Sequence, residues 1–269
     1  VNQYESNAMA QQFANSGYKV VEEGQKADIA IVNTCTVTNM ADRKSRQLLR
    51  KIKKMNPNTV VVAVGCYVQV AKEKVEAIPE IDLVLGNNEK KDIIKYAKRY
   101  IDEQEKLNEV TDVMHQKEFV DLGIITYTEQ TRAVIKIQDG CDRFCTYCII
   151  PYARGRVRSR KPKAILEEVK KIVAQGLQEI VITGIHVASY GKDFEQNYKL
   201  IDLLENLNKV ENLKRIRLSS IEPMIITDEF IKRLKKLDKI CHHFHLSLQS
   251  GCDKTLKRMN RRYTTAEFM

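Results

Sequence analysis

The stretch GCDRFCTYC at residues 140–148 places Cys141, Cys145 and Cys148 at the spacing C-x3-C-x2-C. Thiolates are the protein ligands of iron–sulfur clusters, and three of them in one loop can hold three irons of a [4Fe–4S] cube. The loop contains no fourth cysteine, so one iron would keep an open coordination position for a substrate or cofactor. The apolar run at 133–138 predicts a strand just before the loop. The cluster would then lie at the carboxyl end of a strand, where barrel enzymes carry out their chemistry.

Zinc is the alternative metal for this loop. A structural zinc ion takes four ligands, commonly from paired C-x2-4-C motifs or with histidines. His242, His243 and His245 lie far along the chain and offer such ligands, but they are more simply explained as ordinary strand residues. We therefore favour the iron–sulfur interpretation.

The composition is that of a globular protein with one large domain or two ordinary ones. The chain has 269 residues, of which 43% are hydrophobic and 30% are charged. That mixture supplies a sizeable core and excludes a disordered, collagen-like or coiled-coil chain. The longest uncharged runs, 29–41 and 55–71, are too short or too interrupted to span a membrane, so no membrane partner is expected. Seven cysteines without dense spacing argue against a disulfide framework and predict a cytoplasmic location.

Residues 1–101 alternate short apolar runs with helical patterns, which predicts an open, parallel α/β sheet. Strands are expected at 28–33, 59–64 and 81–85. Ligands of such sheets bind beyond the carboxyl ends of the strands. Cys35 and Cys66 each follow a strand, so the two side chains can approach each other although they are distant in sequence.

Residues 102–130 are polar and of mixed charge, and they are interpreted as a linker. A second series of strands and helices occupies residues 131–269, with strands expected at 133–138, 179–183, 215–219 and 243–248. Four β/α units without closure predict half of an eight-stranded barrel or an incomplete smaller one.

Polar residues at the ends of the later strands are candidate ligand contacts, although each is also explained as loop capping. These candidates are Thr183, Gly184, His186, Ser219, Ser220, Glu222, Gln249 and Ser250.

The charge balance predicts an anionic partner. The chain has 45 Lys and Arg against 35 Asp and Glu, for a net charge of +10, and nucleic acid is the commonest partner of a basic surface. A solvated lysine-rich face is the alternative. The densest basic stretch, RGRVRSRKPK at 154–163, suggests an extended segment that presents guanidinium groups to phosphates; a structural belt of ion pairs is the alternative. Tyr147 and Tyr152 are candidates for stacking on bases or for packing in the core.

The longer string KIQDGCDRFCTYCIIPYARGRVRSR at 136–160 resembles the methylthiotransferases among the radical S-adenosylmethionine (SAM) enzymes. Within that family it is most similar to the members that act on N6-threonylcarbamoyladenosine in tRNA. The similarity continues in VNQYES at 1–6, VNTCTVT at 32–38, VGCYVQ at 64–69, LSSIEP at 218–223 and HLSLQSGCDKTLKRMNRRYT at 245–264. It therefore covers essentially the whole chain.

The resemblance implies three parts: an N-terminal domain with a second [4Fe–4S] cluster, a radical SAM partial barrel, and a C-terminal β domain that binds RNA. Cys141, Cys145 and Cys148 match the ligands of the radical cluster, and Cys35 and Cys66 match the second and third ligands of the auxiliary cluster. The first auxiliary cysteine of these enzymes stands just before the VNQYES string, which here begins at residue 1. We therefore expect a fragment that lacks this ligand, the end of the barrel and the RNA-binding domain, and that does not complete the reaction alone.

The resemblance also implies an activity. The open iron of the radical cluster binds SAM, one electron cleaves it, and the resulting radical removes hydrogen from C2 of the adenosine at position 37, next to the anticodon. The auxiliary cluster supplies the methylthio group. The implied cofactors are two [4Fe–4S] clusters and SAM, and the implied partners are tRNA, an electron donor and a sulfur source. Gly184, Ser219, Ser220, Glu222, Gln249 and Ser250 are the expected cofactor contacts, whereas Cys241 and Cys252 match no ligand.

Other interpretations stay open at this point. Within the same chemistry, the substrate is alternatively isopentenyl-adenosine in tRNA or an aspartate of a ribosomal protein. A hypothesis of another class is a non-catalytic iron–sulfur or zinc module that binds RNA. It predicts that the strand ends at Gly184, Ser219, Glu222 and Gln249 are ordinary loops.

Overall fold

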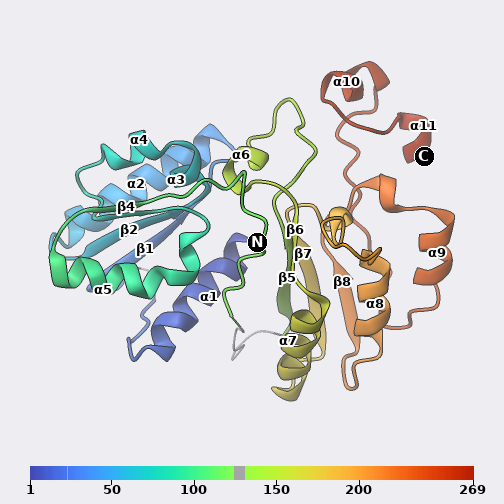
Figure 1. The fold of residues 1–269 in the computed structure, drawn as a ribbon, viewed down its shortest axis with the longest axis horizontal. Helices are drawn as coiled ribbons and strands as arrows, with labels where there is room; N and C mark the ends of the chain where they lie inside the picture. Colours follow the sequence, from blue (N-terminus) through green and yellow to red (C-terminus); the bar gives the residue numbers. More distant parts are fainter. Residues whose placement is uncertain (23, 124–130) are drawn as a thin grey trace.

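The computed structural model describes residues 1–22, 24–123 and 131–269. Within these ranges the chain forms two separate sheets, the first in the N-terminal half and the second in the C-terminal half (Figure 1). The predicted α/β class, an open parallel sheet followed by a second, incomplete barrel-like sheet, is confirmed. None of the described helices is long and apolar enough to cross a lipid bilayer.

The first sheet is entirely parallel and has the strand order β1-β2-β3-β4. In the inner strand β2, alternate apolar side chains point to opposite faces of the sheet, and both faces are covered, as is usual for a parallel sheet. Val61 and Ala63 point to a core shared with the helices that follow β1 and β2, whereas Val62 and Val64 point to a core on the opposite face. The strands are β1 (Ile29–Thr34), β2 (Val60–Gly65), β3 (Leu83–Leu85) and β4 (Leu107–Glu109).

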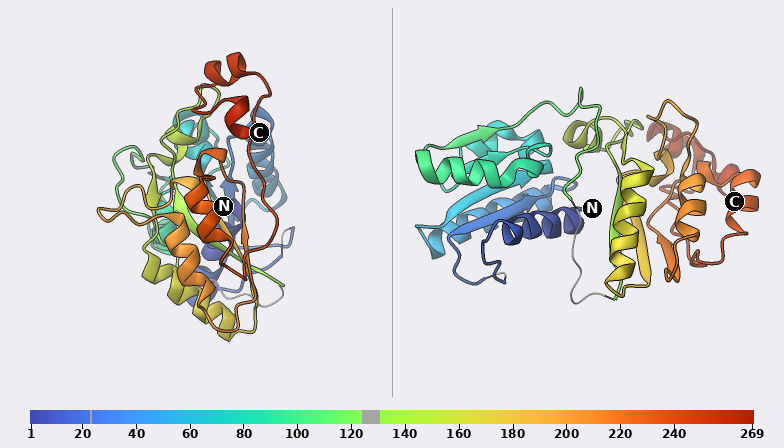
Figure 2. Two further views of the ribbon diagram at one scale, coloured as in Figure 1. Left: turned by 90° about the vertical axis from the view of Figure 1, so that its right-hand side faces the viewer. Right: turned by 60° about the horizontal axis from the view of Figure 1, so that its bottom comes forward.

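Helices cover both faces of this sheet. One face carries α2 (Asn39–Met55), α3 (Cys66–Val70) and α4 (Lys72–Glu76), and the other carries α1 (Asn2–Asn15) and α5 (Ile93–Glu103), which follows a 3-10 turn at Glu89–Asp92. Helix α1 also reaches the second sheet, as the right-hand view of Figure 2 shows. Its Met9 and Phe13 pack on the first core, whereas Tyr4 and Ala8 belong to the core of the C-terminal half.

The segment predicted as a linker, 102–130, differs from that prediction. Helix α5 continues to Glu103, and β4 joins the sheet beside β3. Of this short edge strand only Leu107 is buried, so the sequence shows no apolar run there. Further along, Val113 and Leu122 are buried as well. The part 124–130 of the predicted linker lies outside the described residues.

The second sheet has the order β6-β5-β7-β8, in which β5, β7 and β8 are parallel and β6 is antiparallel to β5. Three helices, α7 (Pro162–Ala174), α8 (Leu200–Asn208) and α9 (Asp228–Leu234), supply its main core on the outer side. The strands are β5 (Ala133–Asp139), β6 (Arg158–Ser159), β7 (Glu179–Gly184) and β8 (Arg215–Leu218); the short helices are α6 (Ile150–Arg154), α10 (Asp253–Arg258) and α11 (Thr265–Phe268), with 3-10 turns at Val187–Ser189 and Pro223–Ile225.

The strand predicted at 243–248 is wrong as a regular strand. The chain touches β8 and its extension only through single parallel bridges, Ile216 to Ile240 and Ile221 to Leu246. Residues 242–245 are exposed, and within the described ranges no further strand lies on their far side. The segment is bonded to the sheet on one side only and through single bridges, so most of it forms no regular strand.

The turn from β5 into the cysteine loop yields a stability prediction. Gly140 has φ +70°, and a Cβ atom at this position would lie 1.8 Å from the carbonyl oxygen of Arg156. The substitution Gly140→Ala therefore combines an unfavourable φ with a backbone overlap, and we expect it to lower the free energy of unfolding by about 3 kcal/mol. Urea denaturation measures the loss.

The control is Gly176→Ala. Gly176 also has a positive φ, +94°, but a Cβ atom added there would have nothing within 4 Å of it, so the cost should be limited to backbone strain of about 1 kcal/mol. Equal losses for the two variants would contradict the overlap at Gly140.

Candidate functional site

The three cysteines of the loop lie together at the carboxyl end of β5. Cys141 and Cys145 are buried and Cys148 is partly exposed. The loop is held by its main chain, because the N–H of Cys141 donates to the carbonyl of Gly155 (3.0 Å) and that of Cys148 donates to the carbonyl of Cys145 (2.9 Å). Burial raises the pKa of Cys141 to about 11, and the neighbouring thiols of Cys145 and Cys148 add to the rise. Burial also raises the pKa of Cys145.

The donor set of this loop fits a cluster better than a single ion. Among the described residues, no three His, Cys, Asp or Glu side chains converge closely enough to hold one metal ion. A [4Fe–4S] cube binds each thiolate to a different iron. The loop supplies three free thiols for that role.

A segment more than a hundred residues later clamps the cysteine loop. Thr146 donates through its N–H to the carbonyl of Met259 (3.3 Å) and through its hydroxyl to the carbonyl of Arg258 (3.1 Å). The side-chain amide of Asn260 donates to the carbonyl of Phe144 (3.1 Å), a residue with the left-handed φ of +46°. The unusual backbone of the loop is thus stabilised by the chain around α10.

Glu222, which follows β8, is the centre of a second set of contacts at this edge. Its side chain is 4% exposed, and it accepts hydrogen bonds from Arg143 of the cysteine loop, from His186 Nε2 (3.0 Å) and from Arg261 (3.3 Å). Burial alone would raise the pKa of Glu222, but the hydrogen bond from His186 and the charges of His186 and the two arginines lower it to about 2. Glu222 therefore joins the loop after β7, the loop after β8 and the cysteine loop.

The other predicted cofactor contacts divide into two groups. Gly184 packs on Gln138, whose side chain donates to the carbonyl of Gly140 at the start of the cysteine loop (2.7 Å). Gln249 accepts a hydrogen bond from the hydroxyl of Tyr147 within that loop (3.1 Å). The second group has local partners: the Ser219 N–H donates to Ile182 O, the Ser220 hydroxyl bonds to His245, and the Ser250 hydroxyl accepts from the Cys252 N–H.

Cys35 and Cys66 are neighbours because of the strand register. Thr34 pairs with Gly65 at the end of the parallel β1–β2 ladder, so the residue that follows each strand is a cysteine. Glycine is needed at position 65, since its φ is +108° and a Cβ there would lie 2.7 Å from the carbonyl oxygen of Thr34. Cys66 is buried and Cys35 is partly exposed.

Helix α6 joins the two cysteine sites. This helix begins two residues after Cys148 and packs on α3, which begins at Cys66. At its end, the Nε–H of Arg154 donates to the sulfur of Cys66 (3.2 Å). Sequence patterns did not indicate this contact, because Arg154 and Cys66 belong to different halves of the chain.

The prediction that the basic stretch 154–163 presents its guanidinium groups to phosphates is largely wrong. Arg154, Arg158 and Arg160 are at most 3% exposed and form buried ion pairs, such as that of Arg160 with Glu168. Part of this stretch forms strand β6, which pairs with β5 at the sheet edge. For these three arginines the alternative interpretation, a structural belt of ion pairs, therefore holds. Arg156, Lys161 and Lys163 remain exposed.

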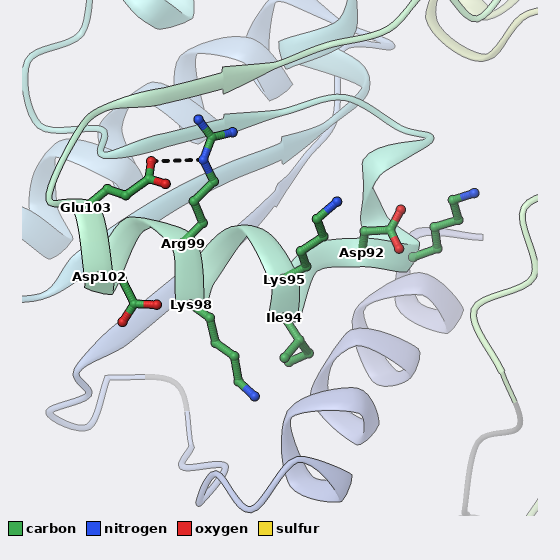
Figure 3. Close-up of a pocket in the computed structure, with 8 residues that line it drawn as sticks. Asp92, Ile94, Lys95, Lys98, Arg99, Asp102 and Glu103 are labelled. Atoms are coloured by element: carbon green, nitrogen blue, oxygen red, sulfur yellow. Dashed lines mark hydrogen bonds and ion pairs between the residues drawn. The ribbon is translucent and has the colours of Figure 1, made fainter.

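The surface formed by the described residues has hollows at two places of interest. One, of about 290 Å³, lies between the loops after β7 and β8 and borders the cysteine loop at Arg143; Tyr190, Lys192, Met224 and Phe230 also line it. The other is a depression along α5, lined mainly by charged side chains, and Figure 3 shows its Arg99–Glu103 ion pair. The depression on α5 is lined by no residue of the cysteine loop, whereas Arg143 of that loop lines the other hollow, so the hollow at Arg143 is the one that borders the candidate site.

Comparisons with known proteins agree with this geometry. Residues 135–269 match the family model of the Radical SAM superfamily. The chain belongs to that superfamily. Residues 1–86 of this radical SAM chain match the Uncharacterized protein family UPF0004. The radical SAM part of the expected resemblance is thereby confirmed.

Several curated relatives match the radical SAM chain over its whole length. It is 43% identical to the threonylcarbamoyladenosine tRNA methylthiotransferase MtaB of Bacillus subtilis, with 100% of the chain and 59% of the relative covered. It is 40% identical to the MtaB of Aquifex aeolicus (100% and 65% covered) and 35% identical to the tRNA-2-methylthio-N(6)-dimethylallyladenosine synthase of Clostridium tetani (100% and 60%). The chain thus spans about three fifths of the length of these relatives.

Solved structures support the fold alone. The radical SAM methyltransferase TsrM from Kitasatospora setae superposes with a TM-score of 0.68 at 15% identity, covering 98% of this chain and 60% of that one. The cobalamin-dependent SAM radical enzyme OxsB gives a TM-score of 0.56 at 16% identity, covering 96% and 39%. At such identities only the arrangement of sheets and helices is shared.

The contacts of Glu222 predict a pH dependence of stability. Because the pKa of the folded state is about 2, below the ordinary 4.5, the contribution of Glu222 is complete above pH 4.5 and is lost as the pH falls toward 2. The variant Glu222→Gln should lose about 3 kcal/mol at neutral pH. Its deficit relative to the wild type should shrink through that acidic window.

Chemical denaturation of both proteins between pH 7 and pH 2.5 measures this difference. The exposed Glu211 serves as the control position, and Glu211→Gln should follow the wild-type curve. A deficit of Glu222→Gln that stays constant across the acidic range would contradict the assignment.

Proposed function

We propose that this chain is the larger part of a radical SAM methylthiotransferase that adds a methylthio group to C2 of N6-threonylcarbamoyladenosine at position 37 of tRNA. The observation that carries the proposal is the junction of two cysteine sites through α6. The loop with Cys141, Cys145 and Cys148 ends at α6, and the last residue of this helix contacts Cys66. Two cysteine sites at the carboxyl ends of two sheets suit a reaction that needs a radical and a sulfur donor in one place.

Cys141, Cys145 and Cys148 are the proposed ligands of the SAM-cleaving cluster. Bound there with SAM, a [4Fe–4S] cluster supplies a carbon radical that can remove hydrogen from an aromatic C–H position. The chain itself orients the reactants. Gly184, Ser219, Ser220, Gln249 and Ser250 remain the candidates for direct contact with SAM. Glu222 has both oxygens occupied, so we assign it to holding Arg143 and His186 in place at this edge.

A second cluster is proposed at Cys35 and Cys66. The support is their adjacency at the end of the β1–β2 ladder and the position of the start of α1 at the same edge. The main-chain oxygen of Asn2 accepts a hydrogen bond from Asn33 of β1, and its side chain accepts one from Arg154. The ends of β1 and β2 and the start of α1 therefore converge beside Cys66. A sulfur source and an electron donor complete the proposed reaction.

The proposed RNA partner is supported by the surface around the cysteine loop. Tyr147 and Tyr152 are 54% and 57% exposed, so of the two interpretations of these residues the structure favours contact with bases over packing in the core. Arg258 and Arg262 are exposed on the segment that clamps the loop. Aromatic rings flanked by guanidinium groups bind single-stranded anticodon loops by stacking and by phosphate contact. A tRNA substrate implies a cytoplasmic location.

The dimethylallyladenosine synthases are the second candidate. The enzyme of Clostridium tetani is 35% identical over the whole chain, against 43% for the threonylcarbamoyladenosine enzyme of Bacillus subtilis. Both activities attack the same C2 position of an adenosine, so the cysteine sites do not separate them.

Cysteine variants of the full-length protein test the radical chemistry. After anaerobic reconstitution, Cys145→Ala should lose the iron and sulfide of one cluster and should form no 5′-deoxyadenosine from SAM. Cys252, which is exposed and matches no ligand, gives the control, because Cys252→Ala should retain both. Iron analysis and chromatography of the nucleoside product are the measurements. A folded wild-type protein that cleaves no SAM under reducing conditions would favour the non-catalytic RNA-binding module instead.

Nucleoside analysis of tRNA identifies the substrate. In a strain that lacks the gene, mass spectrometry should show threonylcarbamoyladenosine without its methylthio group, whereas isopentenyl-adenosine should keep its normal methylthiolation. The full-length gene should restore the missing group, and a Cys145→Ala gene should not. Loss of the methylthio group from isopentenyl-adenosine instead would assign the chain to the second candidate.

A further inference from the structure

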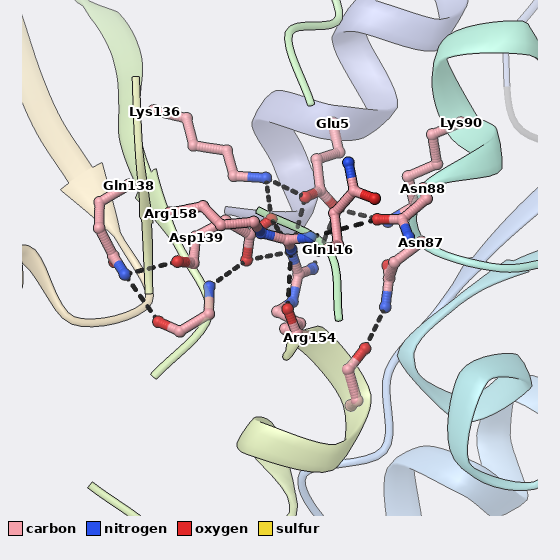
Figure 4. Close-up of polar contacts among 12 residues, drawn as sticks. Glu5, Asn87, Asn88, Lys90, Gln116, Lys136, Gln138, Asp139, Arg154 and Arg158 are labelled. Atoms are coloured by element: carbon pink, nitrogen blue, oxygen red, sulfur yellow. Dashed lines mark hydrogen bonds and ion pairs between the residues drawn. The ribbon is translucent and has the colours of Figure 1, made fainter. Parts of the chain in front are cut away.

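A cluster of buried charges occupies the junction between the two halves of the chain, and Figure 4 shows its contacts. Its members come from α1, the turn after β3, β5, α6 and β6, and each is at most 6% exposed. We call it the junction cluster; it consists of Glu5, Lys90, Lys136, Asp139, Arg154 and Arg158.

Arg154 is the member that touches most of the others. Its two terminal nitrogens donate to Glu5 at 2.7 and 3.0 Å and to Asp139 at 3.1 Å. The remaining N–H, on Nε, points to the sulfur of Cys66 at 3.2 Å. The planar guanidinium places its donors in a rigid fork, so the direction of the Nε–H toward Cys66 is set by the two carboxylates on its other side.

The junction cluster carries more positive than negative charge. Four cations face two carboxylates, which leaves an excess of two positive charges in a region closed to solvent. Unbalanced buried charge is costly unless an anion lies nearby. Cys66 lies against this excess, and the amide of Asn87, which also holds α6 through the carbonyl of Ala153 (2.7 Å), approaches the same sulfur at 3.7 Å. The surroundings of Cys66 thus suit a negatively charged group.

The same guanidinium is tied to the other cysteine site. Asp139, which accepts from Arg154, also accepts the N–H of Gly140 (2.8 Å), the residue that precedes Cys141. A displacement of Arg154 would therefore disturb both the start of the cysteine loop and the sulfur of Cys66.

We propose that Arg154 is a positioning residue for the second cluster, one that orients the Cys66 sulfur through its Nε–H and raises the reduction potential of the cluster bound there. The inference rests on the proposed function, because it needs a cluster at Cys35 and Cys66. An N–H donor to a ligand sulfur and a nearby excess of positive charge both favour the form with one more electron. The sign of the effect follows from this: loss of the Arg154 Nε–H donor and of the guanidinium charge makes the cluster harder to reduce.

The test uses the full-length protein with Cys141, Cys145 and Cys148 changed to Ala, so that only the second cluster binds. In this triple cysteine variant, called the parent, we compare Arg154→Gln with Arg154→Lys. The first removes the positive charge, whereas the second keeps the charge but lacks the planar set of guanidinium N–H donors. Iron content and a redox titration followed by electron paramagnetic resonance are the readouts. Both variants should shift the midpoint potential to more negative values, and Arg154→Gln should shift it further or lose the iron.

Arg160 provides the matched control. It is also buried in the same stretch, at 3% exposure, but its side chain pairs with Asp121 and Glu168 at the flank of β6 rather than with a cysteine. The variant Arg160→Lys should lower stability while leaving iron content and potential at the parent values.

The outcomes separate the inference from the proposed function. A parent that binds iron, with Arg154 variants whose iron content and potential are unchanged, overturns the inference alone. A parent that binds no second cluster overturns the proposed site at Cys35 and Cys66 and the inference with it. If Arg154→Gln does not fold, Arg154→Lys decides, since it retains the positive charge that Glu5 and Asp139 require.

Discussion

The arrangement of this chain depends on the contacts of one guanidinium group at the junction of its halves. Arg154 lies between Glu5 of α1 and Asp139 of β5, and it reaches Cys66 beyond the end of β2. Breaking a buried ion pair from one side typically costs about 3–5 kcal/mol, because the partner charge is left in a place closed to water. The ion pairs of Arg154 therefore link the two sheets more specifically than apolar packing would, since they need a particular distance and direction.

This link lies where the parallel strands of the two sheets expose their carboxyl ends. Open α/β sheets bind ligands at that edge because the loops there are free to vary while the strands hold them in place. Here the edge of the first sheet carries Cys35 and Cys66, and that of the second carries the loop from Cys141 to Cys148. Helices α3 and α6 pack against each other between them. In the second sheet, Glu222 holds the loops after β7 and β8 against the cysteine loop.

Some features were predictable because they are local. The cysteine spacing lies within one loop, the alternation of apolar runs with helical patterns indicated both sheets, and the register that brings Cys35 next to Cys66 follows once two parallel strands are neighbours. The prediction failed where the signal depends on distant partners. The arginines at 154, 158 and 160 were predicted to lie on the surface. Their alternation with small residues indicates an extended segment, but it does not show whether another part of the chain covers the arginine side chains. Strand β6, with only two residues, covers them by pairing with β5. Strand β4 was missed for a similar reason, since only Leu107 of its three residues is buried.

The sequence by itself determined the donor set and its spacing, the α/β class, and the family to which residues 135–269 belong. These follow from covalent spacing and from periodicity, which act over a few residues to a few tens of residues. Only the tertiary structure decided that Arg154 contacts Cys66, that residues 258–261 hold the cysteine loop, and that Glu222 binds Arg143, His186 and Arg261. Each of these contacts joins residues tens to more than a hundred positions apart, and burial of the charged groups strengthens the contacts of Arg154 and Glu222. Such burial exists only after the distant elements have packed together.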